Sequence, residues 1–166
     1  MNRGAAKARG DVFYFVHADI VPPASFYRDI SHKCLHGKLA GRYAMWFASR
    51  RPALMINALF SHLNLLWCSG GDQTFFIRRS TWEALAGFDE QYVIMEEYDL
   101  LRRLHHQFGP KAFTVMHRHV LTTDRKYQGN GYWKVNRANL KAFRMWRQGK
   151  DPRAILRFYR AKLFQD

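Results

Sequence analysis

The spacing of apolar residues changes along the chain between two periods, and this change predicts an α/β fold. Short apolar runs bounded by Gly, Pro or Asp are typical of buried strands, whereas apolar residues spaced three and four apart predict helices. Strands are expected at 11–17, 42–48 and 73–78, with shorter ones at 112–116 and 120–123. Helices are expected at 2–9, 25–36, 52–66, 80–85 and 95–108, followed by two basic helices between 132 and 164.

Polar side chains follow the first predicted strand, where it gives way to a loop. His17 and Asp19 stand two residues apart, and side chains two apart on an extended segment point the same way. A carboxylate suits Mg²⁺ or Mn²⁺, and an imidazole shifts the preference toward Mn²⁺. The triplet therefore predicts a metal or diphosphate site, and the alternative is a strand end with solvated polar groups.

A second motif, Gly70-Gly71-Asp72-Gln73, comes directly before the third predicted strand. Two glycines allow the backbone to turn sharply or to approach a ligand closely. Asp72 would then lie at the mouth of the strand, with Gln73 beside it. The alternative is a plain Gly-Gly-Asp turn without a ligand.

The third motif is acidic, with Glu96, Glu97 and Asp99 at the start of the helix predicted at 95–108. The helix dipole favours carboxylates in a first turn, so stability alone is one explanation. Clustered carboxylates also raise each other's pKa, as a general base requires. Glu96 and Asp99 are expected on one face of the helix, with Glu97 directed elsewhere, toward a substrate hydroxyl.

The composition fits one domain with an anionic partner. Of the 166 residues 48% are apolar, and 27 Lys and Arg against 13 Asp and Glu give a net charge of +14. Such a field attracts nucleic acid, an acidic membrane or a phosphorylated small molecule. The most apolar stretch, 54–67, is too short and polar to span a bilayer, and two cysteines predict packed thiols rather than a disulfide framework.

Together the three motifs resemble glycosyltransferase family 2. The resemblance rests on GAAKARGDVFYFVHADIVPP, GGDQTFFIRRSTWEALAGFDE and YVIMEEYDLLRRL, and it extends over nearly the whole chain, including 122–127 and the basic C-terminal helices. Within the family, the His-Ala-Asp triplet is similar to that of a branch whose members are often assigned to arsenosugar biosynthesis.

The resemblance implies a partial GT-A fold, with a mixed sheet flanked by helices, and a metal-dependent, inverting transfer of a sugar. It implies a nucleotide-diphosphate sugar as donor, an acceptor hydroxyl and a divalent cation, Mn²⁺ or Mg²⁺. It divides the chain into the C-terminal part of a GT-A catalytic domain (1–128) and a basic helical extension (129–166). The expected location is cytoplasmic, with peripheral contact to an acidic inner membrane face through the basic helices.

The resemblance also implies a role for each candidate residue. The metal would be held by Asp19 with His17 nearby, and Asp72 would lie on the acceptor side with Gln73 beside it. Glu97 falls where the family usually has an aspartate as the base, and Glu96 or Asp99 could share that task. Two further residues, Arg125 and Lys126, suit the leaving diphosphate as donors, and solvated surface residues are the alternative.

One departure concerns the start of the chain. Family members normally place a strand-and-helix region that holds the nucleotide before the position of Asn2, so a chain truncated at its N-terminus is expected. The alternatives are a non-catalytic remnant of the fold and a basic nucleic-acid-binding module built on residues 125–160. The nucleic-acid alternative leaves the carboxylates at 19, 72 and 96–99 unexplained, because they would repel phosphates.

Overall fold

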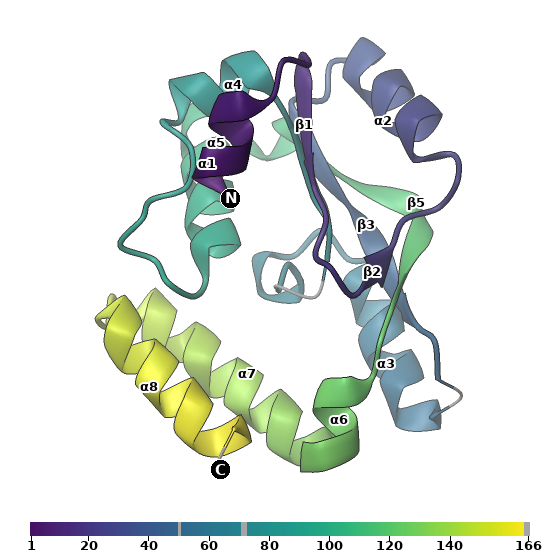
Figure 1. Cartoon of the computed structure of the whole chain (residues 1–166). Coiled ribbons are helices and arrows are strands. Elements are labelled where there is room, and N and C mark those ends of the chain that lie inside the picture. Colours follow the sequence, from purple (N-terminus) through teal and green to yellow (C-terminus); the bar gives the residue numbers. More distant parts are fainter. Residues whose placement is uncertain (50, 71–72, 165–166) are drawn as a thin grey trace.

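The structure is a computed structural model that describes residues 1–49, 51–70 and 73–164 (Figure 1). Its strands are β1 (Val12–Phe15), β2 (Ile20–Val21), β3 (Ala40–Phe47), β4 (Phe75–Arg78) and β5 (Phe113–Thr122). Its helices are α1 (Asn2–Lys7), α2 (Phe26–Leu35), α3 (Pro52–Ser61), α4 (Arg79–Ala84), α5 (Glu96–Phe108), α6 (Arg125–Asn130), α7 (Tyr132–Arg147) and α8 (Pro152–Leu163), with short 3-10 turns η1 (Leu66–Cys68) and η2 (Pro110–Ala112).

The strands form one mixed sheet in the order β1-β4-β3-β5-β2. β3 and β5 run parallel, and the other neighbouring pairs are antiparallel. The central strands β4 and β3 are buried almost throughout, as their nearly continuous apolar sequences require. The loops after β1 and before β4 carry two of the three motifs.

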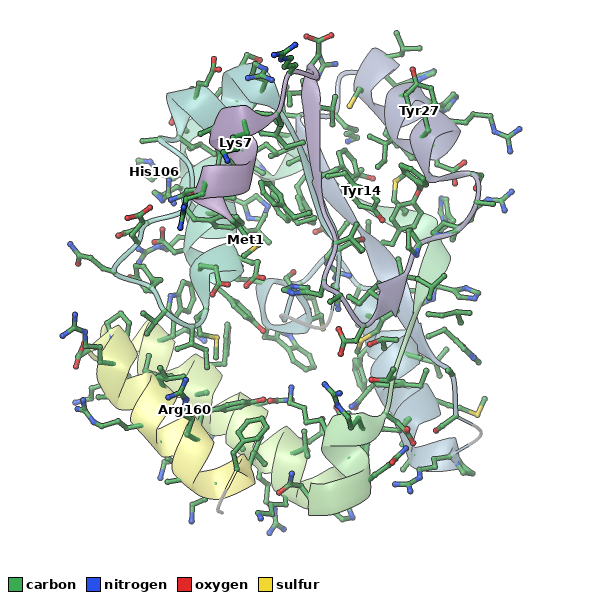
Figure 2. All side chains as sticks on the ribbon, in the orientation of Figure 1. Met1, Lys7, Tyr14, Tyr27, His106 and Arg160 are labelled. Atoms are coloured by element: carbon green, nitrogen blue, oxygen red, sulfur yellow. The ribbon has the colours of Figure 1, made fainter. Side chains whose placement is uncertain are left out.

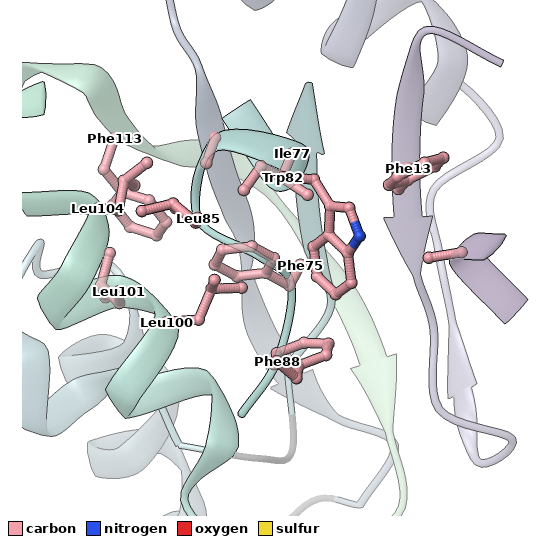
Figure 3. Close-up of a cluster of buried hydrophobic side chains, with 12 residues drawn as sticks. Phe13, Phe75, Ile77, Trp82, Leu85, Phe88, Leu100, Leu101, Leu104 and Phe113 are labelled. Atoms are coloured by element: carbon pink, nitrogen blue, oxygen red, sulfur yellow. The ribbon is translucent and has the colours of Figure 1, made fainter. Parts of the chain in front are cut away.

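Two hydrophobic clusters cover the two faces of this sheet. On one face, α4 and α5 pack against Phe75 and Ile77 of β4, and Figure 3 shows these residues with Trp82, Leu100 and Leu104. On the other face, α2 packs against Phe76. Neighbouring residues of β4 therefore serve opposite clusters, because side chains alternate across a strand. Each large side chain buried in this way contributes about 1.5–3 kcal/mol.

The two basic C-terminal helices confirm the prediction and pack side by side across one end of the molecule (Figure 1). Val135 and Ala138 of α7 join Leu163 of α8 in a cluster with the end of β3. Ala142 and Trp146 of α7 join a second cluster with Tyr98 and other residues at the start of α5. The α7–α8 hairpin therefore packs against the start of α5, which carries the acidic motif.

Several predicted boundaries were wrong. The two strands expected at 112–116 and 120–123 form one strand, β5, with a bulge. Met116 pairs with Tyr43, and His119 pairs with the next residue of β3, so two polar residues of β5 are accommodated between them. The helix expected at 52–66 ends at Ser61, where the Ser61 hydroxyl donates to the carbonyl of Ala58 and competes with helical bonding.

The first strand is also shorter than expected. It ends at Phe15, and the amide of Ile20 donates to the carbonyl of His17 across a turn. His17 and Asp19 therefore do not share an extended segment, so the alternation of side chains along a strand does not apply to them. The turn instead leaves Asp19 exposed and His17 half-buried.

Two smaller expectations concern the cysteines and the membrane. Cys34 and Cys68 are both buried free thiols, as predicted, and burial raises the pKa of each. Among the residues that the structure describes, no helix combines the length and the apolar character needed to cross a membrane.

Candidate functional site

The fold brings the first and third motifs together. His17, just after β1, lies beside Glu97, in the first turn of α5, with 3.6 Å between His17 Nε2 and Glu97 Oε1. The His17 side chain is 36% exposed and that of Glu97 is 12% exposed. One partner is therefore open to solvent and the other is sheltered, which is an arrangement that suits a ligand approaching from the His17 side.

Glu96 belongs to the same electrostatic group. Its pKa is raised, first by burial and then by the negative charge of Glu97, while the proximity of His17 opposes the rise. Because the charges of Glu97 and His17 act on Glu96, a further charge that enters the group changes the pKa of Glu96. The expected partnership of Glu96 with Asp99 is thus less important than its coupling to Glu97 and His17.

The helix start that carries these carboxylates has an unusual backbone. Met95, the residue before α5, has a φ of 67° in the left-handed region, which costs a non-glycine residue about 1–3 kcal/mol. Burial of the Met95 side chain against Tyr98 and Trp146 offsets this cost. Backbone strain of this kind is concentrated at functional sites, and here it fixes the direction in which α5 begins.

Gly70 and Gln73 of the second motif lie next to Glu97. Gly70, Gln73 and Glu97 line a cavity of about 10 Å³, enough for about one water molecule. Gln73 is buried and donates to the carbonyl of Cys68 at 2.8 Å. A Cβ at position 70 would lie 2.9 Å from the hydroxyl of Tyr98, so Gly70 permits a close approach of its loop to α5. Asp72 lies outside the described residues.

This cavity is too small for a sugar nucleotide. Glu97 is one of its lining residues, whereas His17 and Asp19 are the more exposed residues of the site. The cavity is instead lined by residues with buried polar atoms. The Gln73 Oε1 and Arg42 Nε atoms that border it are buried, and neither has a hydrogen-bond partner among the described residues.

Arg42 is a site-forming residue that the sequence analysis missed. Only 2% exposed, it donates through Nη1 to the carbonyl of Ser61 at 2.6 Å and through Nη2 to that of Leu63 at 2.9 Å. Burial lowers its pKa to about 10, so the side chain stays charged at neutral pH. It fastens the chain after α3 onto β3 and thereby positions the loop that leads to Gly70. A lone Arg within a buried apolar strand was the available signal.

Asp99 has a different environment from Glu96 and Glu97. It is 3% exposed and accepts from Arg102 Nη2 at 2.8 Å and from Arg103 Nε at 2.7 Å. Arg103 also donates to the carbonyls of Leu85 and Gly87. Asp99 therefore holds α5 to the loop after α4, which is a structural task.

The structure does not bring Arg125 and Lys126 to the His17–Glu97 pair. Both lie in the first turn of α6, which Figure 1 places near the C-terminal hairpin, away from the start of α5. Arg125 is exposed, and the Lys126 ammonium lies 5.5 Å from the centre of the Tyr159 ring on α8. In this arrangement the Lys126 side chain contacts the basic hairpin.

A divalent cation held by His17 and Asp19 would rely on its substrate and on water for further ligands. The described residues contain no group of three or more His, Cys, Asp or Glu side chains placed for one metal ion. Mg²⁺ in phosphate-handling sites keeps several waters and takes only one or two carboxylates plus substrate oxygens. The imidazole of His17 and the carboxylate of Asp19, two residues on, are of the right kind for Mg²⁺ or Mn²⁺.

Comparison with known proteins decides the fold. No protein-family profile matches the sequence, and no curated protein matches it significantly. Glucosyl-3-phosphoglycerate synthase from Mycobacterium tuberculosis, solved with Mn²⁺, UDP-glucose and phosphoglyceric acid, superposes with a TM-score of 0.52 and 18% identity. A structure of the same enzyme with Mn²⁺, UDP-glucose and glycerol 3-phosphate gives the same values. The chain has a partial GT-A fold.

The match covers 89% of this chain and 53% of the synthase, so the chain spans about half the length of the structures it resembles. Within the GT-A fold, the curled mixed sheet and its flanking helices are the shared part. At this identity the likeness concerns the fold, and the chemistry of this chain has to be argued from its own residues.

Proposed function

We propose that this chain carries the catalytic part of a metal-dependent glycosyltransferase of family 2, which transfers a sugar from a nucleotide-diphosphate donor to an acceptor hydroxyl with inversion. The observation that carries the proposal is the 3.6 Å approach of His17 and Glu97, because it joins a cation-binding motif to a sheltered carboxylate within a GT-A fold. The similar synthase structures contain Mn²⁺ and UDP-glucose, which supports a donor of this class.

Glu97 is the residue proposed as the base. Its carboxylate would accept the proton of the acceptor hydroxyl, whose oxygen forms a bond to the anomeric carbon as the bond to the diphosphate oxygen breaks. The electron pair of that broken bond leaves with the diphosphate, so one displacement inverts the configuration. The sheltered position of Glu97 beside His17 would hold the base in one orientation, which such a reaction requires.

His17 and Asp19 are the residues proposed to hold the divalent cation. When bound, this cation would neutralise the charge that develops on the departing diphosphate. Asp19 is exposed in the turn after His17, so a donor diphosphate can reach its carboxylate from solvent. Asp72 and Gln73 remain the proposed acceptor-side residues. Arg125 and Lys126 remain proposed to donate hydrogen bonds to the leaving diphosphate, which would require α6 to approach the site.

Calorimetry with uridine and guanosine diphosphates, with and without Mn²⁺, tests the donor site. We expect metal-dependent binding by the chain, weakened at least about tenfold in Asp19→Ala, because a lost carboxylate ligand removes both charge and geometry. Asp11→Ala is the matched control, since Asp11 is also exposed and lies at the other end of β1. Binding without metal, or equal binding by both variants, would contradict the assignment of Asp19.

A transfer assay with Glu97→Gln tests the base. The amide keeps the size of the side chain and removes its proton-accepting charge, so turnover should fall by about 10²–10⁴ while nucleotide binding stays within about twofold. Glu83→Gln, on the exposed surface of α4, should retain full turnover. If Glu97→Gln stays active, the base is Glu96 or another group.

A further inference from the structure

The C-terminal hairpin of α7 and α8 carries a concentration of positive charge. Between Tyr132 and Leu163 the sequence has ten Lys and Arg residues and one acidic residue, Asp151. All ten cations are exposed, and none of them forms an ion pair with a carboxylate of the described residues. Ordinary solvated helices intersperse both signs, so this surface is suited to an anionic partner.

On both helices the cations lie at exposed positions, and Lys150 lies in the connection between the helices. On α8, Arg153, Arg157 and Arg160 follow one another at spacings of four and three, opposite the buried Ile155. Such spacing places them on one helical face. Since both helices bury their apolar stripes in the same two clusters, their opposite sides form one continuous outer surface.

Large apolar side chains lie on this same outer surface. Trp133 on α7 is 71% exposed, Leu140 is 45% exposed, and Phe164 at the end of α8 is 60% exposed. Trp133 and Leu140 are two turns apart on the side of α7 that also carries the exposed Arg137 and Arg144. Exposed Trp, Leu and Phe between basic residues are typical of segments that lie in a lipid interface.

We propose that the outer surface of the α7–α8 hairpin binds the anionic headgroups of a lipid bilayer. The positive charge complements phosphate and carboxylate headgroups, and the three apolar side chains can enter the boundary between headgroups and acyl chains. Nucleic acid shares the charge complementarity. Nucleic-acid binding does not explain the exposed Leu140, because base recognition relies on aromatic stacking and polar contacts.

Flotation with vesicles of phosphatidylcholine, with and without phosphatidylserine, tests the proposal on the whole chain. We expect binding only to the anionic vesicles, weakening as salt is raised. The triple variant Arg153→Glu, Arg157→Glu, Arg160→Glu should bind about 100-fold more weakly, since each basic residue near an anionic surface contributes about a factor of five. Trp133→Ala should weaken binding at high salt, where the apolar contribution remains.

The matched control is Arg3→Glu, Lys7→Glu, Arg9→Glu, which changes the net charge equally at exposed positions on and near α1. Figure 2 shows Lys7 on α1 and Arg160 on α8 in separate parts of the molecule. The control should keep vesicle binding within about threefold. Equal loss in both triple variants would overturn the assigned surface, as would wild-type protein that ignores the vesicles and binds single-stranded RNA instead. Thermal unfolding of every variant verifies that each is folded.

Discussion

The first turn of α5 and the α7–α8 hairpin both concentrate charge of one sign, and they do so in opposite environments. The three carboxylates of α5 are partly or fully buried, and one of them pairs with two arginines. The ten cations of the hairpin are all exposed and have no carboxylate partner among the described residues. A buried cluster changes the pKa of its members and suits chemistry, whereas an exposed one creates a field and suits binding to a large anionic partner.

The largest effect should come from the most deeply buried charge of this comparison. Asp99→Ala removes the partner of Arg102 and Arg103, and the free energy of unfolding should fall by about 3 kcal/mol. On the hairpin, Asp151→Ala removes only a helix cap that accepts from the amide of Arg153, at a cost of about 1 kcal/mol. Urea unfolding measures both, and equal losses would show that burial does not separate the two regions.

A second effect concerns how tightly the start of α5 is built. Gly70→Ala would place a methyl group 2.9 Å from the Tyr98 hydroxyl, and we expect a loss of about 1–2 kcal/mol from this overpacking. Tyr98→Phe removes the clashing oxygen, so Gly70→Ala should cost less in that background. A double-mutant cycle by urea unfolding checks this coupling, and additive losses would argue against the close approach.

A smaller effect follows from the raised pKa of Glu96. Because burial in the folded state raises this pKa above the usual value of a glutamate, the folded state favours the protonated carboxyl. Stability is therefore lost as pH rises through the folded pKa. Glu96→Gln should raise Tm at neutral pH by roughly 2 °C, and the gain should vanish below pH 4.5. Calorimetric scans across this range provide the measurement, and a gain that persists in acid would have another cause.

The smallest effect is expected on the hairpin. Arg157→Glu replaces one of three neighbouring cations on α8 and creates opposite-charge neighbours at Arg153 and Arg160. Such pairs contribute about 0.2–0.5 kcal/mol, so the free energy of unfolding should rise slightly or stay within about 0.5 kcal/mol. A large loss in urea unfolding would mean that Arg157 has a structural partner and would weaken the contrast with α5.

Much of the fold could be predicted from local signals. Pro152 begins α8 and Gly109 follows α5, as expected from the residues that commonly start and end helices. The bulge in β5 could not be predicted, because its polar His117 and Arg118 have the composition of a loop. The short helix α6 was missed as well, since its sequence, RKYQGN, has no apolar period.

The candidate site was predictable in its residue types and less so in its geometry. The motifs identified His17 and Glu97 separately. Their contact depends on how α5 packs on the face of the sheet that includes β1. Asp99 and Glu97 look alike in sequence, and only the neighbouring arginines distinguish their tasks. Arg42 carried no motif, because its importance comes from two carbonyls that a distant loop presents to it.

Paramagnetic broadening by Mn²⁺ in the presence of uridine diphosphate tests the central claim most directly. In amide NMR spectra, the signals of His17, Asp19 and Glu97 should broaden at low metal concentration, and those of Arg153 and Arg157 on the hairpin should remain sharp. This outcome would place the cation beside the sheltered carboxylate. Broadening that is confined to other parts of the chain, or an absence of broadening, would contradict a metal-assisted site at the His17–Glu97 pair.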